Sequence, residues 1–568
     1  MSFQVSPGVN VSEIDLTSAI PAVSVSTGAF AGAFNWGPAL VPVTVTSEVE
    51  LAAKFGSPDN NTAASFFTSA NFLSYSNDLK VVRAQAAGAN NASANNVLGV
   101  RIPNDDYYFN NQYTSSTGTP GYPWAARCLG ALGNSLEVIV WASAAQWTGD
   151  TTGFAGVFDF APGTSQDVAN RSGFAGANDE LHIAVVDVYG HFTGTPNTVL
   201  EKFASVSAIA DAVTSDGTSN YYKEVIYRRS KYVYWTGIPQ ANTSGWGKNA
   251  AEVTGNNFVG HDATALTEIL VGGADGVVSD GNTTTAMAVF TNPEFIDISL
   301  LMTGSASNVV ATYAVELAES RKDCVAFFSP SLAATQDLTD PSVAISTWAN
   351  GVYRSSYGVM DSGWKYQYDK YSDMYRWVPL NGDIAGLCAR TDNVRDPWWS
   401  PAGLQRGTVK NVVRLAFNPN KAQRDTLYKA GINSVVSFPG EGTLLFGDKT
   451  FQNRPSAFDH INVRRLFIVL EKAIAKAARS SLFEFNDDFT RAQFVSIVEP
   501  FLRTVKGRRG VYDYKVVCDT TNNTPDIIDG NQFVGDIYIK PARSINFIQL
   551  NFVAVRTGVS FDEVVGKF

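Results

Sequence analysis

One stretch of the sequence comes close to a phosphate-binding loop. In GEGTLLFGDKT (residues 440–450), Gly442 and Gly447 have the separation that the motif GxxxxGK[ST] requires, but Asp448 intervenes before Lys449. The inserted residue moves the lysine away from a bound phosphate, and its carboxylate repels the anion. The apolar letters TLLF also favour a buried strand, whereas a phosphate loop exposes its backbone N–H groups. The pattern therefore argues against nucleotide binding.

The other reactive residue types lack the spacing that catalysis or metal binding needs. The histidines and the cysteines lie far apart, without an HExxH, HxxxH or CxxC pattern, and no serine stands in a G-x-S-x-G turn. Asp369 and Asp373 are spaced for one helix face or a turn, but no third ligand in the order of a calcium loop follows. We therefore predict no catalytic residue, no cofactor and no metal, and a protein that is not an enzyme.

The composition is that of an ordered globular protein. Of the 568 residues, 45% are hydrophobic and 17% are charged, and a chain of this length is expected to form about three or four domains. The N-terminus lacks the basic and apolar parts of a signal peptide, and no window approaches the apolar length of a membrane span. We therefore expect a soluble protein, made in a cytoplasm, with reduced and buried thiols.

Charge is divided unevenly along the chain. Residues 401–568 carry 23 basic and 16 acidic side chains, whereas residues 1–400 carry 20 basic and 37 acidic ones. A basic segment of this kind fits either nucleic acid or an acidic protein partner.

One predicted helix concentrates this basic charge. Over residues 462–481, apolar residues recur on one face at helical spacing. The opposite side carries Arg465, Lys472, Lys476 and Arg479, with a single acid in the helix. Exposed helix faces usually interleave acids with bases. The stripe therefore predicts a surface that binds an acidic partner. The alternative is a helix face that is exposed to solvent and binds no partner.

The predicted elements indicate layered α/β structure with a β-rich insertion. Ser47 followed by Glu50 has the spacing of a capping box at a helix start. Alternating segments between about residues 90 and 280, among them YKEVIYRR (222–229), predict strands. Helices and strands then alternate, which indicates a partly parallel sheet. Both ends of the chain carry segments typical of extended strands.

Many blocks of the sequence resemble the tail sheath proteins of contractile-tailed bacteriophages. They include SPGVNVSEID and FGSPDNN near the start, WVPLNGDIAGLCARTDN and PWWSPAG in the middle, and INSVVSFPGEGTLLFGDKT, LFEFNDDFTR and YKVVCDTTNNTPDIIDGNQFVGDIYIKPARSINFI towards the end. Each block alone is a weak signal, but so many in one order are specific. The chain is therefore similar to sheath proteins of large phages at both ends and over most of its length.

The resemblance implies a structural protein that polymerises around a tail tube as stacked, six-membered rings in a helical lattice. It implies contraction from a metastable extended state, which drives the tube through the host envelope for genome delivery. The implied partners are further copies of the chain, the tail tube protein, the baseplate, and tail terminator or neck proteins, with neither nucleic acid nor membrane. The implied location is the tail of the virion, after assembly in the host bacterial cytoplasm.

The resemblance also implies an α/β and α+β multidomain fold, in which a conserved α/β sheath core is built from both chain ends. Pairing between subunits is expected for strand residues of the two arms and of the strand before the C-terminal arm, namely Val9, Val11, Ile14, Ile537, Ile539, Ile548, Leu550 and Phe552. The basic stripe becomes the candidate tube-facing surface. The expected parts are an N-terminal arm (1–22), the first part of the core (23–90), an inserted outward-facing β-rich region (91–280), an α/β middle domain (281–400), a C-terminal core domain (401–541) and a C-terminal arm (542–568).

Three alternatives stay open. The first is the sheath of a phage-derived bacterial contractile injection system. The second is a nucleotide-driven motor that uses the segment 440–450. The third is a surface lattice or adhesin, which predicts a secretion signal that the sequence does not show.

Overall fold

The computed structural model describes residues 25–94, 98–114, 123–238, 245–252, 265–336, 339–452, 454–546 and 549. These residues form two compact units. The larger unit contains the described residues up to Pro397 together with Pro401–Ser480, and the smaller one contains Trp398–Ser400 and the described residues from Ser481 onward. This division differs from the expected C-terminal core domain, which is split after Ser480. The first part of that domain belongs with the α/β core, because its strands and its long helix complete the core.

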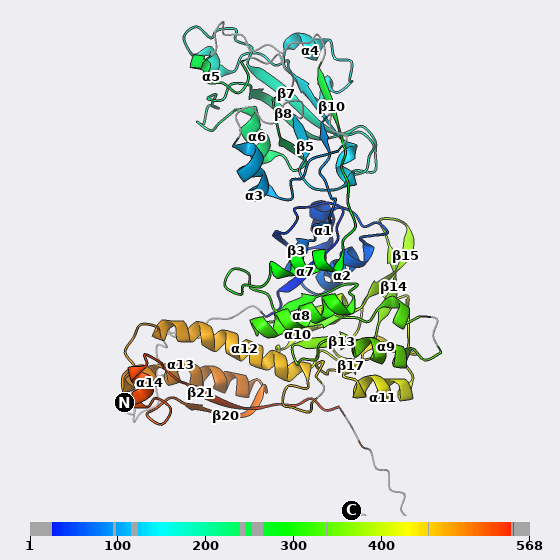
Figure 1. Cartoon of the computed structure of the whole chain (residues 1–568), viewed down its shortest axis with the longest axis vertical. Coiled ribbons are helices and arrows are strands. Elements are labelled where there is room, and N and C mark those ends of the chain that lie inside the picture. The colour runs from blue at the N-terminus through cyan, green and yellow to red at the C-terminus, as the bar shows by residue number, and fades with distance from the viewer. Residues whose placement is uncertain are drawn as a thin grey trace, which may run out of the picture. The chain divides into compact units, whose positions relative to one another are not determined.

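A seven-stranded sheet forms the centre of the larger unit (Figure 1). Neighbouring strands are parallel except at the edge pair β2 and β3. Strands from the start of the chain lie beside strands from the region 300–433, so the expected middle domain is not separate. In sheet order the strands are β17 (Ile432–Asn433), β13 (Gly358–Asp361), β12 (Val325–Phe328), β11 (Leu300–Met302), β1 (Gly28–Gly32), β3 (Leu79–Arg83) and β2 (Pro42–Val45).

Helices bury both faces of this sheet, as parallel sheets require. Along β1, Phe30 points into one core, whereas Ala29 and Ala31 point into the other. The Phe30 side receives buried residues from α1 (Glu48–Phe55), α2 (Ala63–Leu73), α10 (Asn381–Val394) and α12 (Ile461–Ala478). The opposite side receives them from α7 (Asp280–Ala288), α8 (Asn308–Arg321), α9 (Pro341–Ala349) and α11 (Lys421–Lys429).

Two glycines allow α10 to lie directly against α2 and the turn that follows it. A Cβ atom at Gly382 would lie 2.3 Å from the backbone oxygen of Thr68, and one at Gly386 would lie 2.5 Å from the ring of Tyr75. No side chain fits at such distances, so these positions need glycine although glycine weakens a helix.

Local predictions for two elements are confirmed. Helix α1 follows Ser47, whose Oγ accepts from the backbone N–H of Glu50 at 3.2 Å. The carboxylate of Glu50 accepts in turn from the backbone N–H of Thr46 at 2.8 Å. The apolar part of the phosphate-loop-like segment is strand β19 (Gly442–Leu445), which pairs with β18 (Val435–Phe438) in a hairpin.

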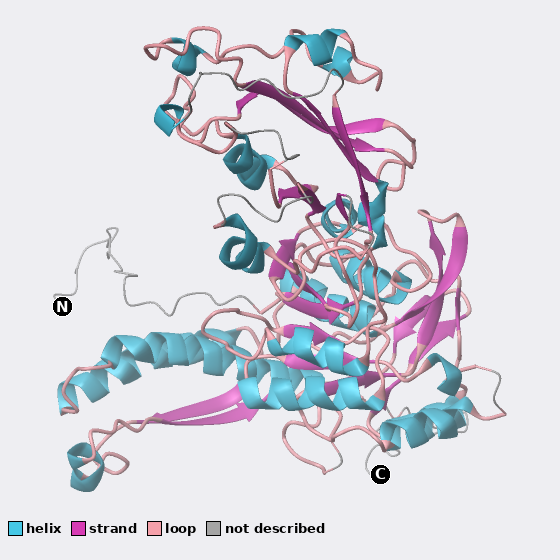
Figure 2. Cartoon of the chain, turned by 45° about the horizontal axis from the view of Figure 1, so that its top comes forward, coloured by secondary structure: helices cyan, strands magenta, loops and turns pink. Residues whose placement is uncertain are grey.

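The inserted region is a second, antiparallel seven-stranded sheet (Figure 2). In sheet order its strands are β8 (Thr198–Ser207), β7 (Glu180–Asp187), β6 (Leu136–Trp141), β10 (Leu266–Val271), β4 (Ser93–Ala94), β5 (Trp124–Ala126) and β9 (Val233–Trp235). The prediction of a strand over residues 222–229 is wrong, because this segment is helix α6 (Tyr222–Arg229). Its buried Tyr222, Val225 and Ile226 have the i, i+3, i+4 spacing of a helix face.

Shorter elements complete the larger unit. They are α3 (Asp105–Tyr108), α4 (Ala144–Thr148), α5 (Gln166–Ala169) and a three-stranded sheet of β15 (Met374–Pro379), β14 (Trp364–Asp369) and β16 (Arg414–Leu415). Within the described ranges, no helix has the length and apolar character needed to cross a membrane.

Candidate assembly surfaces

The smaller unit is built around a two-stranded antiparallel ribbon. Strand β20 (Val511–Val517) pairs with β21 (Asp536–Pro541), and α14 (Pro525–Asp529) lies in the connection between them (Figures 1 and 2). Helix α13 (Asp488–Gly507) precedes the ribbon, begins at the N-cap Asp487 and supplies buried residues such as Phe494 and Val498. A two-stranded ribbon is marginal by itself, so its packing against α13 is needed for its stability.

One face of the ribbon is half-buried and the other is exposed. Ile539 lies opposite Tyr514, and Ile537 lies opposite Val516, and all four are half-buried. Between them, Tyr538 points the other way with 60% of its surface exposed. The two predicted strand-exchange residues of this part therefore lie in a regular strand, with their side chains on the shielded face.

The outer edges of the ribbon carry unused pairing capacity. Among the residues that the structure describes, no third strand pairs with either β20 or β21. An unpaired edge presents a row of backbone N–H and C=O groups that a further strand can bind. The other predicted exchange residues, Val9, Val11, Ile14, Ile548, Leu550 and Phe552, lie outside the described part of the chain.

The predicted basic stripe of α12 does not form one exposed face, because Arg465 is buried. Its guanidinium lies 2.5 Å from Oδ2 of Asp392 and also donates to the backbone oxygens of Cys388 and Val25 at 3.3 and 3.2 Å. Burial alone would lower the pKa of Arg465, but the attraction of Asp392 raises it above its ordinary value. Arg465 thus stays charged and joins α12 to the core, so its predicted exposure is wrong.

Lys472 is also turned inward. Its ammonium lies 2.8 Å from Oδ1 of Asp297 and donates to the backbone oxygen of Ile298 and the hydroxyl of Ser299, each at 2.9 Å. Its side chain is only 12% exposed. The core surrounds residues 461–470 of α12 on all sides, and the segment Asp297–Ser299 lies beside Lys472 just beyond them. Helical periodicity alone cannot show such contacts with distant segments.

The last turns of α12 keep the predicted exposure. Lys476 and Arg479 are exposed, and Arg479 stands in the short 3-10 turn that follows the helix. Two of the four predicted tube-facing residues thus remain available to a partner.

Lys449 and Asp448 of the segment that resembles a phosphate loop make contacts within the larger unit. Lys449 donates to the backbone oxygen of Tyr428 at 3.3 Å, and its ammonium lies 3.8 Å from the centre of that ring. Asp448 is buried and lies 3.1 Å from Nδ1 of His460. The hydrogen bond with Asp448 raises the pKa of His460 above its ordinary value. His460 directly precedes α12, so this pair ties the helix start to the β19 hairpin.

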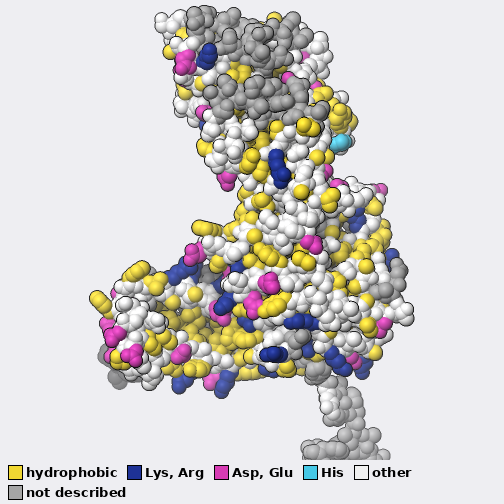
Figure 3. All heavy atoms as spheres, in the orientation of Figure 1, with side chains coloured by type: hydrophobic (Ala, Val, Ile, Leu, Met, Phe, Trp, Pro, Cys, Tyr) yellow, Lys and Arg dark blue, Asp and Glu magenta, His cyan; other side chains and the backbone are white. Residues whose placement is uncertain are grey.

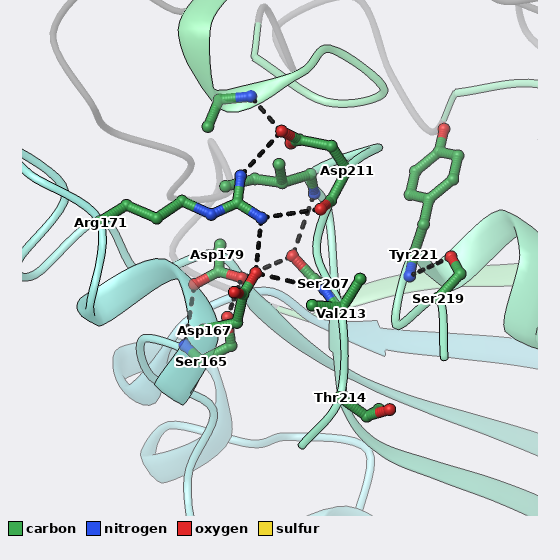
Figure 4. Close-up of polar contacts among 12 residues, drawn as sticks. Ser165, Asp167, Arg171, Asp179, Ser207, Asp211, Val213, Thr214, Ser219 and Tyr221 are labelled. Atoms are coloured by element: carbon green, nitrogen blue, oxygen red, sulfur yellow. Dashed lines mark hydrogen bonds and ion pairs between the residues drawn. The ribbon is translucent and has the colours of Figure 1, made fainter. Parts of the chain in front are cut away.

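A polar cluster in the inserted region is likewise satisfied internally (Figure 4). Arg171 contacts Asp167 at 2.5 Å and Asp211 at 2.8 Å. Beside it, Asp179 accepts from the hydroxyls of Ser165 and Ser207 at 2.8 and 2.5 Å. These contacts join the α5 segment to the start of β7, the end of β8 and the loop that follows β8, and they engage every charged side chain of this set. Across the described ranges, no group of three His, Cys, Asp or Glu side chains has the geometry to hold a metal ion.

Three segments match known protein families. Residues 26–84 match the tail sheath protein Gp18 domain III N-terminal region, residues 276–451 match the phage tail sheath protein central domain, and residues 453–554 match the phage tail sheath C-terminal domain. The unmatched interval between the first two corresponds to the inserted β-rich sheet.

Full-length relatives carry the same description. The chain is 34% identical to the tail sheath proteins of Vibrio phage KVP40 and Enterobacteria phage T4, with 99% of each chain covered. It is 32% identical to that of Salmonella phage ViI, over 99% of this chain and 98% of the relative.

Solved sheath structures share the fold. A sheath tail protein of Listeria innocua matches with a TM-score of 0.51 at 11% identity, over 92% of this chain and 97% of that one. The helical sheath of the anti-feeding prophage in its contracted state matches with a TM-score of 0.50 at 12% identity, over 97% of this chain and 99% of that one. These likenesses, at low identity, concern the fold.

Proposed function

The chain belongs to the family of phage tail sheath proteins, and from this premise we propose that it builds a contractile sheath whose subunits are joined by exchanged strands. The sheath surrounds a tail tube, is assembled in a metastable extended state, and shortens to drive the tube through the host envelope for genome delivery. The energy is stored in contacts between subunits during assembly, so the proposed role is structural and uses no cofactor.

The observation that carries this proposal is the ribbon of β20 and β21, whose two outer edges are not paired with any strand in the described part of the chain. The sequence supplies segments to fill them: Val9 and Val11 alternate with polar residues at one end, with Ile14 three residues further on, and the run 548–552 alternates at the other end. We propose that these segments pair with ribbons of neighbouring subunits. Four or more backbone hydrogen bonds at about 0.5 to 1.5 kcal/mol each, with burial of the apolar side chains at about 25 cal/mol per Å², make such a link hard to break.

Exchanged strands suit an assembly whose subunits move. Linker residues can absorb a rotation while the backbone hydrogen bonds of the exchanged strand persist. Contacts between the bodies of the subunits can then change during contraction without loss of the lattice. A head-to-tail link of this kind generates an open helical assembly instead of a closed dimer.

The end of α12 is the proposed contact with the tube. Lys476 and Arg479 are exposed and basic, so they fit acidic groups on the tube surface. Such a contact weakens with salt and can break on contraction. Arg465 and Lys472 are withdrawn from this surface because their charges are used inside the subunit.

The further partners follow from the same premise. They are other copies of the chain in six-membered rings, the tail tube protein, the baseplate and the tail terminator or neck proteins, in a virion tail assembled in the host bacterial cytoplasm. A phage-derived injection particle is the second candidate. The full-length identity of 32–34% to proteins of three phages favours the virion.

The proposal is tested by removing the C-terminal strand. A chain that ends at Ser544 should fold and remain monomeric, whereas the full chain should form hollow striated cylinders in electron micrographs. A synthetic peptide of residues 542–558 should inhibit polymerisation of the full chain by occupying the ribbon edge. The matched control is the same peptide with Ile548, Leu550 and Phe552 replaced by Asp, which should not inhibit. Cylinders formed by the truncated chain would contradict strand exchange.

The proposed tube contact has a separate test. A Lys476→Glu/Arg479→Glu variant should still polymerise alone but should bind the tube more weakly, most clearly at low salt. A variant with unchanged tube binding would show that the end of α12 faces elsewhere.

A further inference from the structure

Large apolar side chains stand exposed between α12 and α13. The turn and the start of α13 place Leu482, Phe483, Phe485 and Phe489 within eight residues, and their exposed fractions are 62%, 104%, 84% and 77%. Single exposed apolar residues are common, but a contiguous group of this size marks a contact surface. The backbone of Phe483 also adopts a left-handed conformation, with φ of 69°. This conformation is unfavourable for a bulky residue and keeps the ring turned away from the unit.

Acidic side chains lie in the same turn and in the neighbouring α14 segment. Glu484 lies in the turn, and Asp526 and Asp529 lie in α14, and all three are exposed. The side chain of Asn486 donates to the backbone oxygen of Gln532 at 2.8 Å, which holds the turn beside the α14 segment. Acidic and apolar side chains occur together at this end of the unit (Figure 3). We call this surface, formed by Leu482–Phe485, Phe489, Asp526 and Asp529, the acidic end.

The other end of α13 has the opposite charge. Arg503, Lys506, Arg508 and Arg509 are exposed in its last turn and just beyond. Lys506 pairs with the exposed Asp513 at 2.9 Å, and the guanidinium groups of Arg508 and Arg509 lie 5.9 and 5.5 Å from the ring centres of Trp398 and Trp399, so the surface keeps an excess of positive charge. Tyr512, which is 67% exposed, adds an aromatic ring to this side. We call this surface the basic end. Helix α13 has 20 residues, which separates the two ends by about 30 Å.

Part of this polarity stabilises the helix itself. Asp487 caps the N-terminus of α13, and acids at a helix start and bases at its end complement the helix dipole. The dipole does not account for the exposed aromatic rings. Nor does it account for Asp526 and Asp529, which belong to another helix.

We propose that the acidic end of one subunit docks on the basic end of a second copy of this chain. The two surfaces are complementary in charge, and the guanidinium group of Arg503 can stack on an exposed phenylalanine ring. Because the surfaces lie at opposite ends of one unit, the contact is head-to-tail and propagates as an open chain. The inference rests on the proposed polymerisation and assigns to it a second contact, separate from the exchanged strands.

Charge reversal at each end provides the test. Variant A carries Glu484→Lys and Asp526→Lys, so both of its ends are basic. Variant B carries Arg503→Glu, Lys506→Glu and Arg509→Glu, so both of its ends are acidic. Each variant alone should need at least about tenfold more protein than the wild type to polymerise, because like charges meet at every contact. An equimolar mixture should polymerise at nearly the wild-type concentration, because A and B can alternate.

The controls separate charge from folding. Glu294→Lys reverses an exposed acid in the larger unit and should leave polymerisation unchanged. Phe483→Ser removes a fully exposed ring, so it should keep the wild-type unfolding temperature yet raise the polymerising concentration several-fold. Circular dichroism and sedimentation of the monomers show whether each variant is folded.

The outcomes are distinguishable. If the wild type and both variants polymerise alike, the docking contact is wrong although strand exchange stands. If A and B fail separately and the mixture also fails, the two ends do not meet each other and the inference is again overturned. If A polymerises alone but fails around a tube, the acidic end contacts the tube instead of a second copy. If the wild type itself does not polymerise, the proposed function fails first.

Discussion

Replacing Arg465 by methionine should destabilise the larger unit without touching any subunit contact. The guanidinium is buried between α10 and α12, with its side chain 4% exposed and that of Asp392 6% exposed. Methionine fills much of the volume but removes the charge and every hydrogen bond. The carboxylate of Asp392 would then stay in the interior without its cation, and among the described residues Oδ1 of Asp392 already has no hydrogen-bond partner.

The size of the effect follows from the burial of the pair. Removal of one member of a buried ion pair costs about 3 to 5 kcal/mol, whereas an exposed pair contributes less than about 1 kcal/mol. The larger unit spans roughly 450 residues, and at an unfolding entropy of about 2.1 cal/mol/K per residue each kcal/mol lowers its unfolding midpoint by roughly 1 °C. The larger unit of the Arg465→Met variant should therefore unfold about 3 to 5 °C below the wild type. Double replacement with Asp392→Leu removes the stranded carboxylate, so it should recover most of the loss.

The assay is thermal unfolding of the monomer, followed by circular dichroism and by calorimetry. Lys476→Met serves as the matched control, because it removes a charge from the exposed part of the same helix. A midpoint lowered by less than about 2 °C, together with weakened binding to a tube, would refute the reasoning. That result would mean that Arg465 lies on the exposed surface that sequence periodicity predicted.

Three further predictions concern other positions. Gly382→Ala should lower the unfolding midpoint of the monomer although alanine favours helices, because the new Cβ would meet the backbone oxygen of Thr68; a raised midpoint would contradict the tight α10–α2 contact. The raised pKa of His460 means that its hydrogen bond with Asp448 contributes stability fully below about pH 6.5 and loses it as pH rises through the higher folded value. A His460→Gln variant should therefore show a flatter pH profile of unfolding, and an unchanged slope would exclude the pair as its source. Trp398→Ala should cost the smaller unit about 3 to 5 kcal/mol, since this 9% exposed ring is buried there and its Nε1 donates to the backbone oxygen of Arg508; hydrogen exchange in α13 should accelerate, and unchanged exchange would count against this role.

Several elements were predictable because their signals are local. Ser47 and the carboxylate three residues later mark a helix start through contacts within one turn, and the structure has that cap. The alternation of helices and strands after residue 280 indicated a partly parallel sheet, which is the centre of the larger unit. The family resemblance also came from short sequence blocks, and relatives that match over nearly the full length of the chain confirm it.

Other predictions failed where burial depends on distant segments. YKEVIYRR alternates weakly enough to fit a strand or a helix, and the packing of Tyr222 and Ile226 in the inserted core decides for the helix. The aromatic rings between α12 and α13 belong to LFEFNDDFTR, one of the sequence blocks that resemble the family. Their exposure could not be read from the sequence, since apolar residues beside a helix start are usually buried.

The sequence by itself determined the class of protein, the main order of helices and strands, and the excess of basic residues in the last third of the chain. These are properties of residue type and short spacing. Only the tertiary structure decided which basic groups are available to a partner. Arg465 and Asp392 are 73 residues apart, and their pairing exists only because α10 and α12 pack together. The same packing divides α12 into a buried half that holds the core together and an exposed end that can meet a partner.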